Sequence, residues 1–273
     1  MPVNSSLSNR LKISGPVIAV LVVSIFFMPH LIKFLIGAIL IRSLWEFFNI
    51  FEPSLPAYGK VLIPFSVVYI IGAWELTEPG QAGLCFAGLL VLFCTQLFFP
   101  SSKGGMARLA ISITGFVYIV GLGCYAIYML NMKTLGLNWG AQLFFASLFT
   151  CKFSDATAYF AGCKYGKHKL VPRVSPNKTW EGLYGAYAGG LCSIPFFWAM
   201  TGFDFFKSLV MVLGLVSVAT VGDLFESQFK RELDVKDTAN DIPGFGGTMD
   251  MIDSVLWVMP ASYYLVVLLG IHK

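Results

Sequence analysis

Long apolar runs, separated by short polar segments, make up most of the chain. Nine such runs lie at 13–29, 31–50, 61–77, 82–99, 108–130, 137–162, 180–201, 207–226 and 254–271. Each approaches the ~20 predominantly apolar residues that a helix needs to cross a bilayer. Only Pro29 and His30 separate the first two runs, which form either a tight hairpin or one kinked helix. The pattern predicts an all-α integral membrane protein, a polytopic bundle of eight to nine transmembrane helices.

The composition agrees with this prediction. Hydrophobic residues make up 56% of the chain, charged residues only 12%, and the mean hydropathy is +0.73. Such values are typical of integral membrane proteins. The net charge of +4 is too small to indicate a nucleic-acid partner and fits a protein that faces anionic lipid. The six cysteines form no CxxC pair, which favours buried thiols over disulfides or a metal site.

Lysine and arginine gather on alternate connecting segments, which predicts the orientation of the chain. With nine spans and the N-terminus inside, the cytoplasmic segments hold Arg10, Lys12, Lys60, Lys103, Arg108, Lys164, Lys167, Lys169, Arg173, Lys178, Lys230, Arg231 and Lys236. The opposite side keeps Lys133, Lys207 and Lys273, with Lys33 a candidate at the first turn. We therefore expect the polar segments 163–180 and 227–253 to face the cytoplasm.

No internal repeat and no linker divides the chain, so we expect one continuous membrane domain. Residues 1–130 are poor in embedded charge and are interpreted as scaffold helices, whereas 131–273 form the catalytic region. Arg42 and Glu46 are an exception within the scaffold. Their i,i+4 spacing predicts a salt bridge near a helix end rather than a functional site.

Acidic residues concentrate near the end of the chain, where eight of the fifteen lie between 223 and 253. Asp223 follows an apolar run, and Asp250 and Asp253 are spaced i,i+3 at the entrance to the last run, with Asp250 placed to cap it. The glycine-rich turn 243–247 precedes that run and would expose backbone N–H groups to a phosphate. Nearby carboxylates suit Mg²⁺. The pattern indicates a nucleoside triphosphate site, and its rival is a solvated loop with an aspartate cap.

A second polar group lies between 154 and 182. Ser154 and Asp155 follow an apolar run, and a basic loop comes next. Ser175 and Pro176 predict a helix start, with Lys178 in the first turn, either neutralised by Glu181 or reaching a phosphate. Gly182, Gly185 and Gly189 predict close helix packing rather than ligand binding.

At these residues the chain resembles the phosphatidate cytidylyltransferase family, also called CDP-diacylglycerol synthase. The carboxy-terminal signature of the family is matched by Ser227, Lys230, Arg231, Lys236, Asp237, Ile242, Pro243, Gly244, Gly246, Gly247, Asp250 and Asp253. Two further family segments are matched by Asp155 to Tyr159 and by Ser175 to Gly182. The resemblance covers about 150–273 and is only hydropathic before that.

The resemblance implies an enzyme that converts CTP and phosphatidate to CDP-diacylglycerol and pyrophosphate at the cytoplasmic face of a bacterial inner membrane. The expected metal ligands are Asp223, Asp250 and Asp253, which would hold Mg²⁺, with a second ion such as K⁺ left open. The expected catalytic residues are Asp223, Lys230, Arg231, Lys236, Asp237, Asp250 and Asp253. The expected substrate-binding residues are Asp155, Ser175, Lys178, Ser227, Gly244, Gly246 and Gly247. The expected partners are CTP, phosphatidate and membrane lipid, and a homodimer is left open.

Two residues depart from the family pattern. Phe245 stands where the family usually has histidine, and Met251 where it usually has arginine. Three rival functions remain open: a CTP-dependent lipid kinase of the dolichol kinase type, a cation transporter, and a paralogue that binds CTP without turnover. A transporter is disfavoured because its charges would lie near the bilayer midplane, often between repeated halves.

Overall fold

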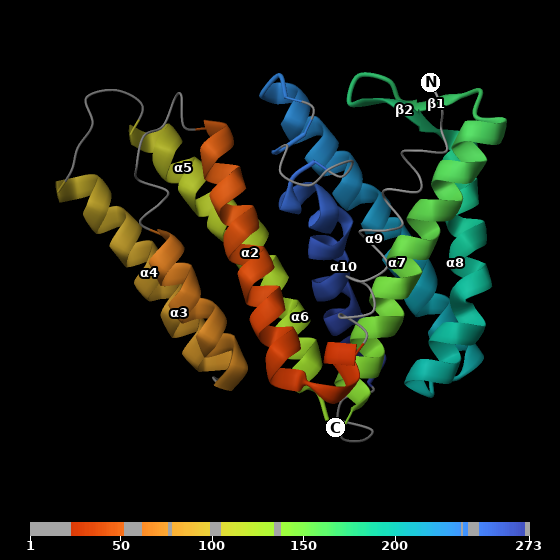
Figure 1. Cartoon of the computed structure of the whole chain (residues 1–273), viewed down its shortest axis with the longest axis horizontal. Coiled ribbons are helices and arrows are strands. Elements are labelled where there is room, and N and C mark those ends of the chain that lie inside the picture. The colour runs from red at the N-terminus through yellow and green to blue at the C-terminus, as the bar shows by residue number, and fades with distance from the viewer. Residues whose placement is uncertain are drawn as a thin grey trace. The chain divides into compact units, whose positions relative to one another are not determined.

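The computed structural model describes residues 23–51, 62–75, 78–98, 105–133, 138–235, 237–239 and 246–270. The elements are α2 (Pro29–Phe51), α3 (Leu62–Glu75), α4 (Glu78–Phe98), α5 (Gly105–Gly115), η2 (Phe116–Gly121), α6 (Leu122–Asn131), α7 (Trp139–Tyr165), β1 (Lys169–Val171), β2 (Ser175–Thr179), α8 (Trp180–Thr201), α9 (Phe205–Glu232) and α10 (Thr248–Leu268). Figure 1 labels the α-helices and strands among them. The element η2 is a π-helical segment between α5 and α6.

The helices coincide with the apolar runs from 31–50 onward, so the prediction of a helical membrane protein is confirmed in its coarse form. Among the described residues, three helical segments are long and apolar enough to cross a membrane, namely Gly105–Asn131, Phe205–Glu232 and Thr248–Leu268. Shorter apolar helices cover Leu62–Glu75 and Gly80–Cys94. The run 13–29 lies largely outside the described residues; residues 23–27 are helical, and Met28 interrupts the helix before α2.

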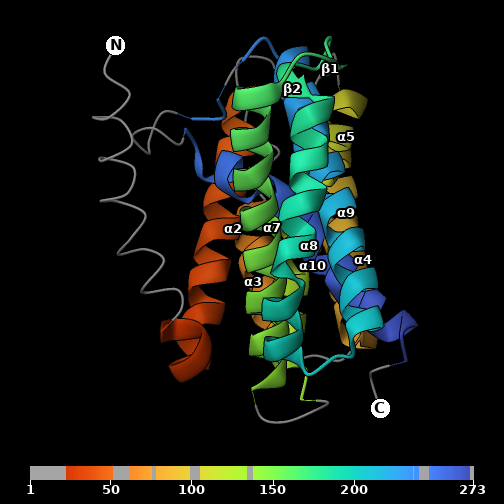
Figure 2. The ribbon, with the colours of Figure 1, turned by 90° about the vertical axis from the view of Figure 1, so that its right-hand side faces the viewer.

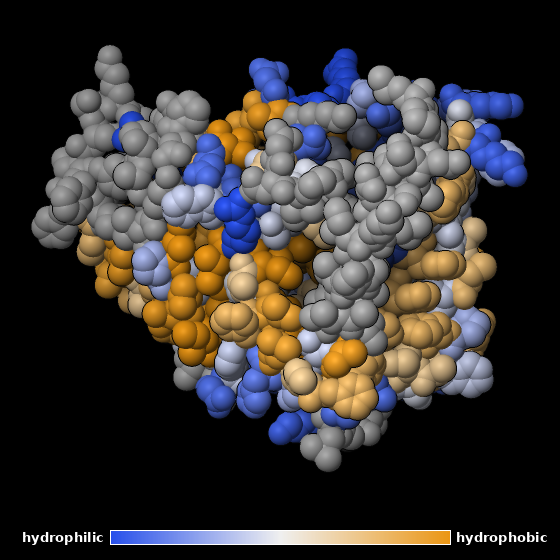
Figure 3. All heavy atoms as spheres, viewed as in Figure 1, coloured by the Kyte–Doolittle hydropathy of each residue, from blue (hydrophilic) through white to orange (hydrophobic). Residues whose placement is uncertain are grey.

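Apolar side chains cover much of the outer surface of the helices, as expected where lipid replaces water. Phe27, Phe86, Leu97 and Met106 are each more than two-thirds exposed. The visible face is correspondingly hydrophobic over the described helices (Figure 3).

The described residues belong to two compact units. The first unit contains those within Met1–Ser24, Met28–Tyr128 and Asp237–Met251, and the second contains Ile25–Phe27, Met129–Lys236 and Ile252–Lys273 wherever these are described. In the first unit, α2 packs against α3, α5 and η2. The π-helical segment places Phe116 against Phe65 and Tyr69, with ring centroids 5.7 and 5.3 Å apart.

In the second unit, α7, α8 and α9 lie side by side (Figures 1 and 2). Small residues allow this close packing. A Cβ at Gly185 would lie 2.4 Å from the Ala161 Cβ and 2.9 Å from the Thr157 carbonyl oxygen, and a Cβ at Gly189 would overlap the Thr157 side chain. The predicted packing role of these glycines is confirmed.

One predicted boundary is wrong. Ser175 and Pro176 do not begin a helix; they lie in β2, which pairs antiparallel with β1 in a two-stranded sheet. This hairpin is a small addition to a chain that is otherwise helical, as predicted. A proline is tolerated here because both strands are edge strands. The helix begins instead at Trp180, with the Thr179 hydroxyl as its N-cap, accepting the Gly182 N–H at 3.1 Å.

The helix α9 carries several predicted site residues and runs further than its apolar segment. Its N-cap is Asp204, whose carboxylate accepts the Lys207 N–H at 2.8 Å. This backbone hydrogen bond lowers the pKa of the Asp204 carboxyl below its ordinary value. The helix continues past the predicted end at 226 to Glu232, so Asp223, Ser227 and Lys230 lie on one continuous helix.

Candidate active site

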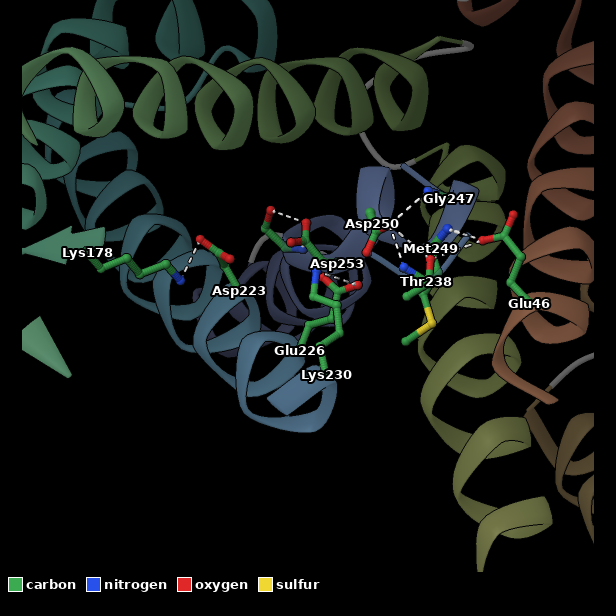
Figure 4. Close-up of polar contacts among 11 residues, drawn as sticks. Glu46, Lys178, Asp223, Glu226, Lys230, Thr238, Gly247, Met249, Asp250 and Asp253 are labelled. Atoms are coloured by element: carbon green, nitrogen blue, oxygen red, sulfur yellow. Dashed lines mark hydrogen bonds and ion pairs between the residues drawn. The ribbon is translucent and has the colours of Figure 1, made fainter. Parts of the chain in front are cut away.

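Predicted site residues occur in both units. In the second unit, β2 brings Lys178 to Asp223 of α9, with 2.7 Å between the ammonium and a carboxylate oxygen (Figure 4). Both side chains are partly buried. Of the two alternatives for Lys178, neutralisation by Glu181 is wrong. Glu181 instead accepts hydrogen bonds from the backbone N–H groups of Lys167 and His168 and contacts the His168 ring at 2.6 Å.

A further group in the second unit joins α7 to α10. The Ser254 hydroxyl lies 3.3 Å from a carboxylate oxygen of Asp155 and 2.9 Å from one of Asp253. The Lys152 ammonium lies 3.7 Å from the same oxygen of Asp155. The structure thus brings two predicted site carboxylates together and adds a cation, as embedded carboxylates require. We call Lys152, Asp155, Asp253 and Ser254 the aspartate pair cluster.

The last turns of α9 carry two further cations. Lys230 lies 3.6 Å from the buried carboxylate of Glu226, one turn earlier (Figure 4). Arg231 is exposed, and Ser227 is partly buried. A lysine and an arginine in the last turn are favourable because the carbonyl end of a helix carries partial negative charge.

In the first unit, the carboxylate of Asp250 accepts hydrogen bonds from nearby residues. Its Oδ2 atom accepts hydrogen bonds from the N–H groups of Gly247 at 2.8 Å and Thr238 at 2.9 Å, and from the Thr238 hydroxyl at 3.0 Å (Figure 4). The predicted capping role of Asp250 at the start of α10 is therefore confirmed.

The buried carboxylate of Glu46, on α2, contacts the same segment. Oε1 accepts the Thr248 N–H at 3.0 Å, and Oε2 accepts the Met249 N–H at 3.0 Å. The predicted ion pair with Arg42 is also present, at 3.3 Å. The interpretation of Glu46 as only a salt-bridge partner was incomplete.

The N–H groups of Gly247, Thr248 and Met249 donate to the carboxylates of the protein. Phosphate binding by the glycine-rich turn stays a prediction. Gly246 and Gly247 serve another purpose. Gly246 has φ +86°, and a Cβ there would lie 2.5 Å from Asp250 Oδ2. A Cβ at Gly247 would lie 2.5 Å from Glu46 Oε2.

The remaining predicted site residues are Ser175, Lys236, Asp237 and Gly244. Asp237 is exposed, and Ser175 is partly buried in β2. Lys236, Gly244 and Phe245 lie outside the described residues.

Sequence reasoning missed Lys152, Ser254, Thr238 and the wider role of Glu46. A signal existed for two of them, because Lys152 and Glu46 are charged residues inside apolar runs, where an ionisable side chain usually has a function. Ser254 and Thr238 carried no such signal, since hydroxyl side chains are common in membrane helices and loops.

The carboxylates of the site can supply only some of the ligands that a Mg²⁺ ion needs. Among the described residues, no group of three or more His, Cys, Asp or Glu side chains is arranged to hold a metal ion. Magnesium in nucleotide sites commonly takes one or two carboxylates and completes its shell with water and phosphate oxygens. The Asp155 and Asp253 pair, joined through Ser254, fits that donor set.

Known proteins resemble this chain along most of its length. The sequence profile of the Cytidylyltransferase family matches residues 8–269. The phosphatidate cytidylyltransferase of Bacillus subtilis is 37% identical over 76% of this chain and 90% of that protein. The phosphatidate cytidylyltransferases of Pseudomonas aeruginosa and Haemophilus influenzae are 32% and 28% identical, over 82% and 90% of this chain and 83% and 93% of those proteins. This chain belongs to the Cytidylyltransferase family.

Proposed function

We propose that the protein is a phosphatidate cytidylyltransferase, which converts CTP and phosphatidate to CDP-diacylglycerol and pyrophosphate in phospholipid synthesis. One observation carries the proposal: the match to the Bacillus subtilis protein of that name spans 90% of its length. The side chains of the candidate site support the same chemistry, because carboxylates can hold a metal ion and lysines can neutralise phosphate oxygens.

The reaction is an attack by a phosphatidate oxygen on the α-phosphorus of CTP. A new P–O bond forms, the bond from the α-phosphorus to the bridging oxygen breaks, and pyrophosphate leaves. A phosphate monoester has its second pKa near ~6, so the attacking group is already largely ionised at neutral pH. No residue has to remove a proton. Transfer then depends on positioning the substrates and neutralising their charge.

The second unit contains residues suited to that work. Lys178 and Lys152 are cations held in place by Asp223 and Asp155, and both can neutralise phosphate oxygens. Asp155 and Asp253 would supply carboxylate oxygens to Mg²⁺. Asp223, on α9, and Asp250, in the first unit, are each proposed as metal ligands in their own right. When bound, Mg²⁺ would neutralise the triphosphate and favour departure of pyrophosphate.

We also propose the topology that the charges indicate: nine spans, with 163–180 and 227–253 on the cytoplasmic side of an inner membrane, where CTP is available. The basic hairpin supports this orientation. Lys167, Lys169 and Arg173 are exposed around β1 and β2, as expected for a cytoplasmic segment.

The test measures pyrophosphate release from CTP by purified protein with phosphatidate, with a polyprenol, or with no lipid. We expect release only with phosphatidate. Release of CDP with the polyprenol would favour the lipid kinase, and no turnover with either lipid would favour a transporter or a protein that only binds CTP.

A further inference from the structure

We propose that Glu46 is a positioning residue for this reaction: from α2 it fixes the start of α10 and thereby the orientation of Asp250. The inference rests on the proposed function, because Asp250 matters for catalysis only if this site performs the transfer. Glu46 itself is not proposed to touch either substrate.

The carboxylate of Glu46 is almost completely enclosed, with 1% of its side chain exposed. Both of its oxygens accept hydrogen bonds from α10, from the consecutive N–H groups of Thr248 and Met249. Figure 4 shows the carboxylate directed at this helix start. A buried carboxylate with two backbone donors holds its target at a defined distance and angle, unlike an exposed ion pair.

The local sequence explains why a distant residue is needed. The first N–H groups of a helix lack partners within the helix, and a side chain of the preceding residue usually satisfies one of them. That residue is Gly247 here, which has no side chain. Glu46 supplies the missing acceptor from 202 residues earlier in the chain. Its negative charge is also favourable beside the positive end of the helix.

Two shared neighbours, Thr238 and Gly247, link Glu46 to Asp250. The Thr238 hydroxyl lies 3.4 Å from Glu46 Oε2 and 3.0 Å from Asp250 Oδ2, so it lies beside both carboxylates. Gly247 contributes to both groups as well, because its N–H donates to Asp250 while its missing side chain leaves room for Glu46. Loss of the Glu46 carboxylate is therefore expected to disturb Thr238 and Gly247, which both donate hydrogen bonds to Asp250.

The test uses Glu46→Gln in the full-length protein in detergent. The amide keeps the size of the side chain but replaces one acceptor oxygen with a donor, which opposes a backbone N–H of α10. We expect the Mg²⁺ concentration for half-maximal formation of CDP-diacylglycerol to rise ~10-fold or more. This is the usual effect of removing a residue that orients a metal ligand. We also expect faster hydrogen exchange at the amides of Thr248 and Met249.

The matched control is Glu75→Gln, the same substitution at an exposed glutamate at the end of α3. It should change neither measurement. If Glu46→Gln does not fold, Thr238→Val removes only the shared hydroxyl and should raise the Mg²⁺ requirement several-fold.

The outcomes separate the two claims. An unchanged Mg²⁺ requirement in Glu46→Gln, or in Thr238→Val where the first variant does not fold, overturns the positioning role even if exchange becomes faster. Unchanged exchange in Glu46→Gln overturns the contact itself. A wild-type protein that forms no CDP-diacylglycerol overturns the proposed function, whereas the exchange experiment still tests the contact between Glu46 and α10.

Discussion

Three predicted site carboxylates on the helices of the second unit, those of Asp155, Asp223 and Asp253, have polar partners nearby. Lys178 lies against Asp223, and Ser254 lies between Asp155 and Asp253. An ionised carboxylate away from water is costly without such partners.

The first prediction concerns the metal-binding carboxylates. Asp253→Asn keeps the size of the side chain but removes its charge, so CDP-diacylglycerol formation should fall ~100-fold, and Asp223→Asn and Asp250→Asn should behave alike. Asp204→Asn is the matched control, because asparagine also caps a helix and Asp204 lies at the N-cap of α9. Wild-type activity in Asp253→Asn would exclude it as a ligand.

At this scale the sequence indicated candidate carboxylates but not how they are paired. Asp250 was expected to cap α10 because it stands at the entrance to the last apolar run, which is a local feature of the sequence. The ion pair between Lys178 and Asp223 could not be predicted from neighbouring residues. It forms because Lys178 lies in β2, which brings it to α9, and not in the first turn of α8.

At the scale of elements, hydropathy located the helices well because each long apolar run has few alternatives in a membrane. The β1–β2 hairpin was missed for a physical reason. Its strands are three and five residues long and rich in lysine, proline and asparagine. Neither strand has the alternating apolar pattern by which strands are recognised.

The second prediction concerns the packing of α8 on α7. Gly185→Ala would place a Cβ 2.9 Å from a backbone carbonyl oxygen, so the helices must separate, at a cost of ~1–3 kcal/mol. The thermal unfolding temperature in detergent should fall. Gly83→Ala on α4 is the control, because a Cβ there meets nothing within 4 Å, and it should be neutral or slightly stabilising. Equal unfolding temperatures for the two variants would contradict the packing.

At the scale of the whole molecule, the contacts that sequence could not indicate are those between distant segments. Glu46 and Met249 are 203 residues apart, and no periodicity relates them. The charge pattern, in contrast, is read over the entire chain, and it predicts the orientation because translocation of lysine and arginine is disfavoured.

The third prediction tests that orientation. In a variant without the six native cysteines, Lys167→Cys should be protected from an impermeant thiol reagent in intact cells, whereas Lys207→Cys should react. Lys167 is exposed and the side chain of Lys207 is 41% exposed, so access to the reagent depends on the side of the membrane. Labelling of Lys167→Cys in cells that have not been permeabilised would contradict the proposed topology.

The most direct test of the proposed function follows the phosphorus atoms of CTP. Purified protein is incubated with phosphatidate, Mg²⁺ and CTP labelled at either the α- or the γ-phosphorus, and the lipid is then extracted. We predict that only the α-label enters the lipid, as CDP-diacylglycerol, while the γ-label leaves as pyrophosphate. Transfer of the γ-label to lipid, or no label in lipid from either CTP, would contradict the proposal.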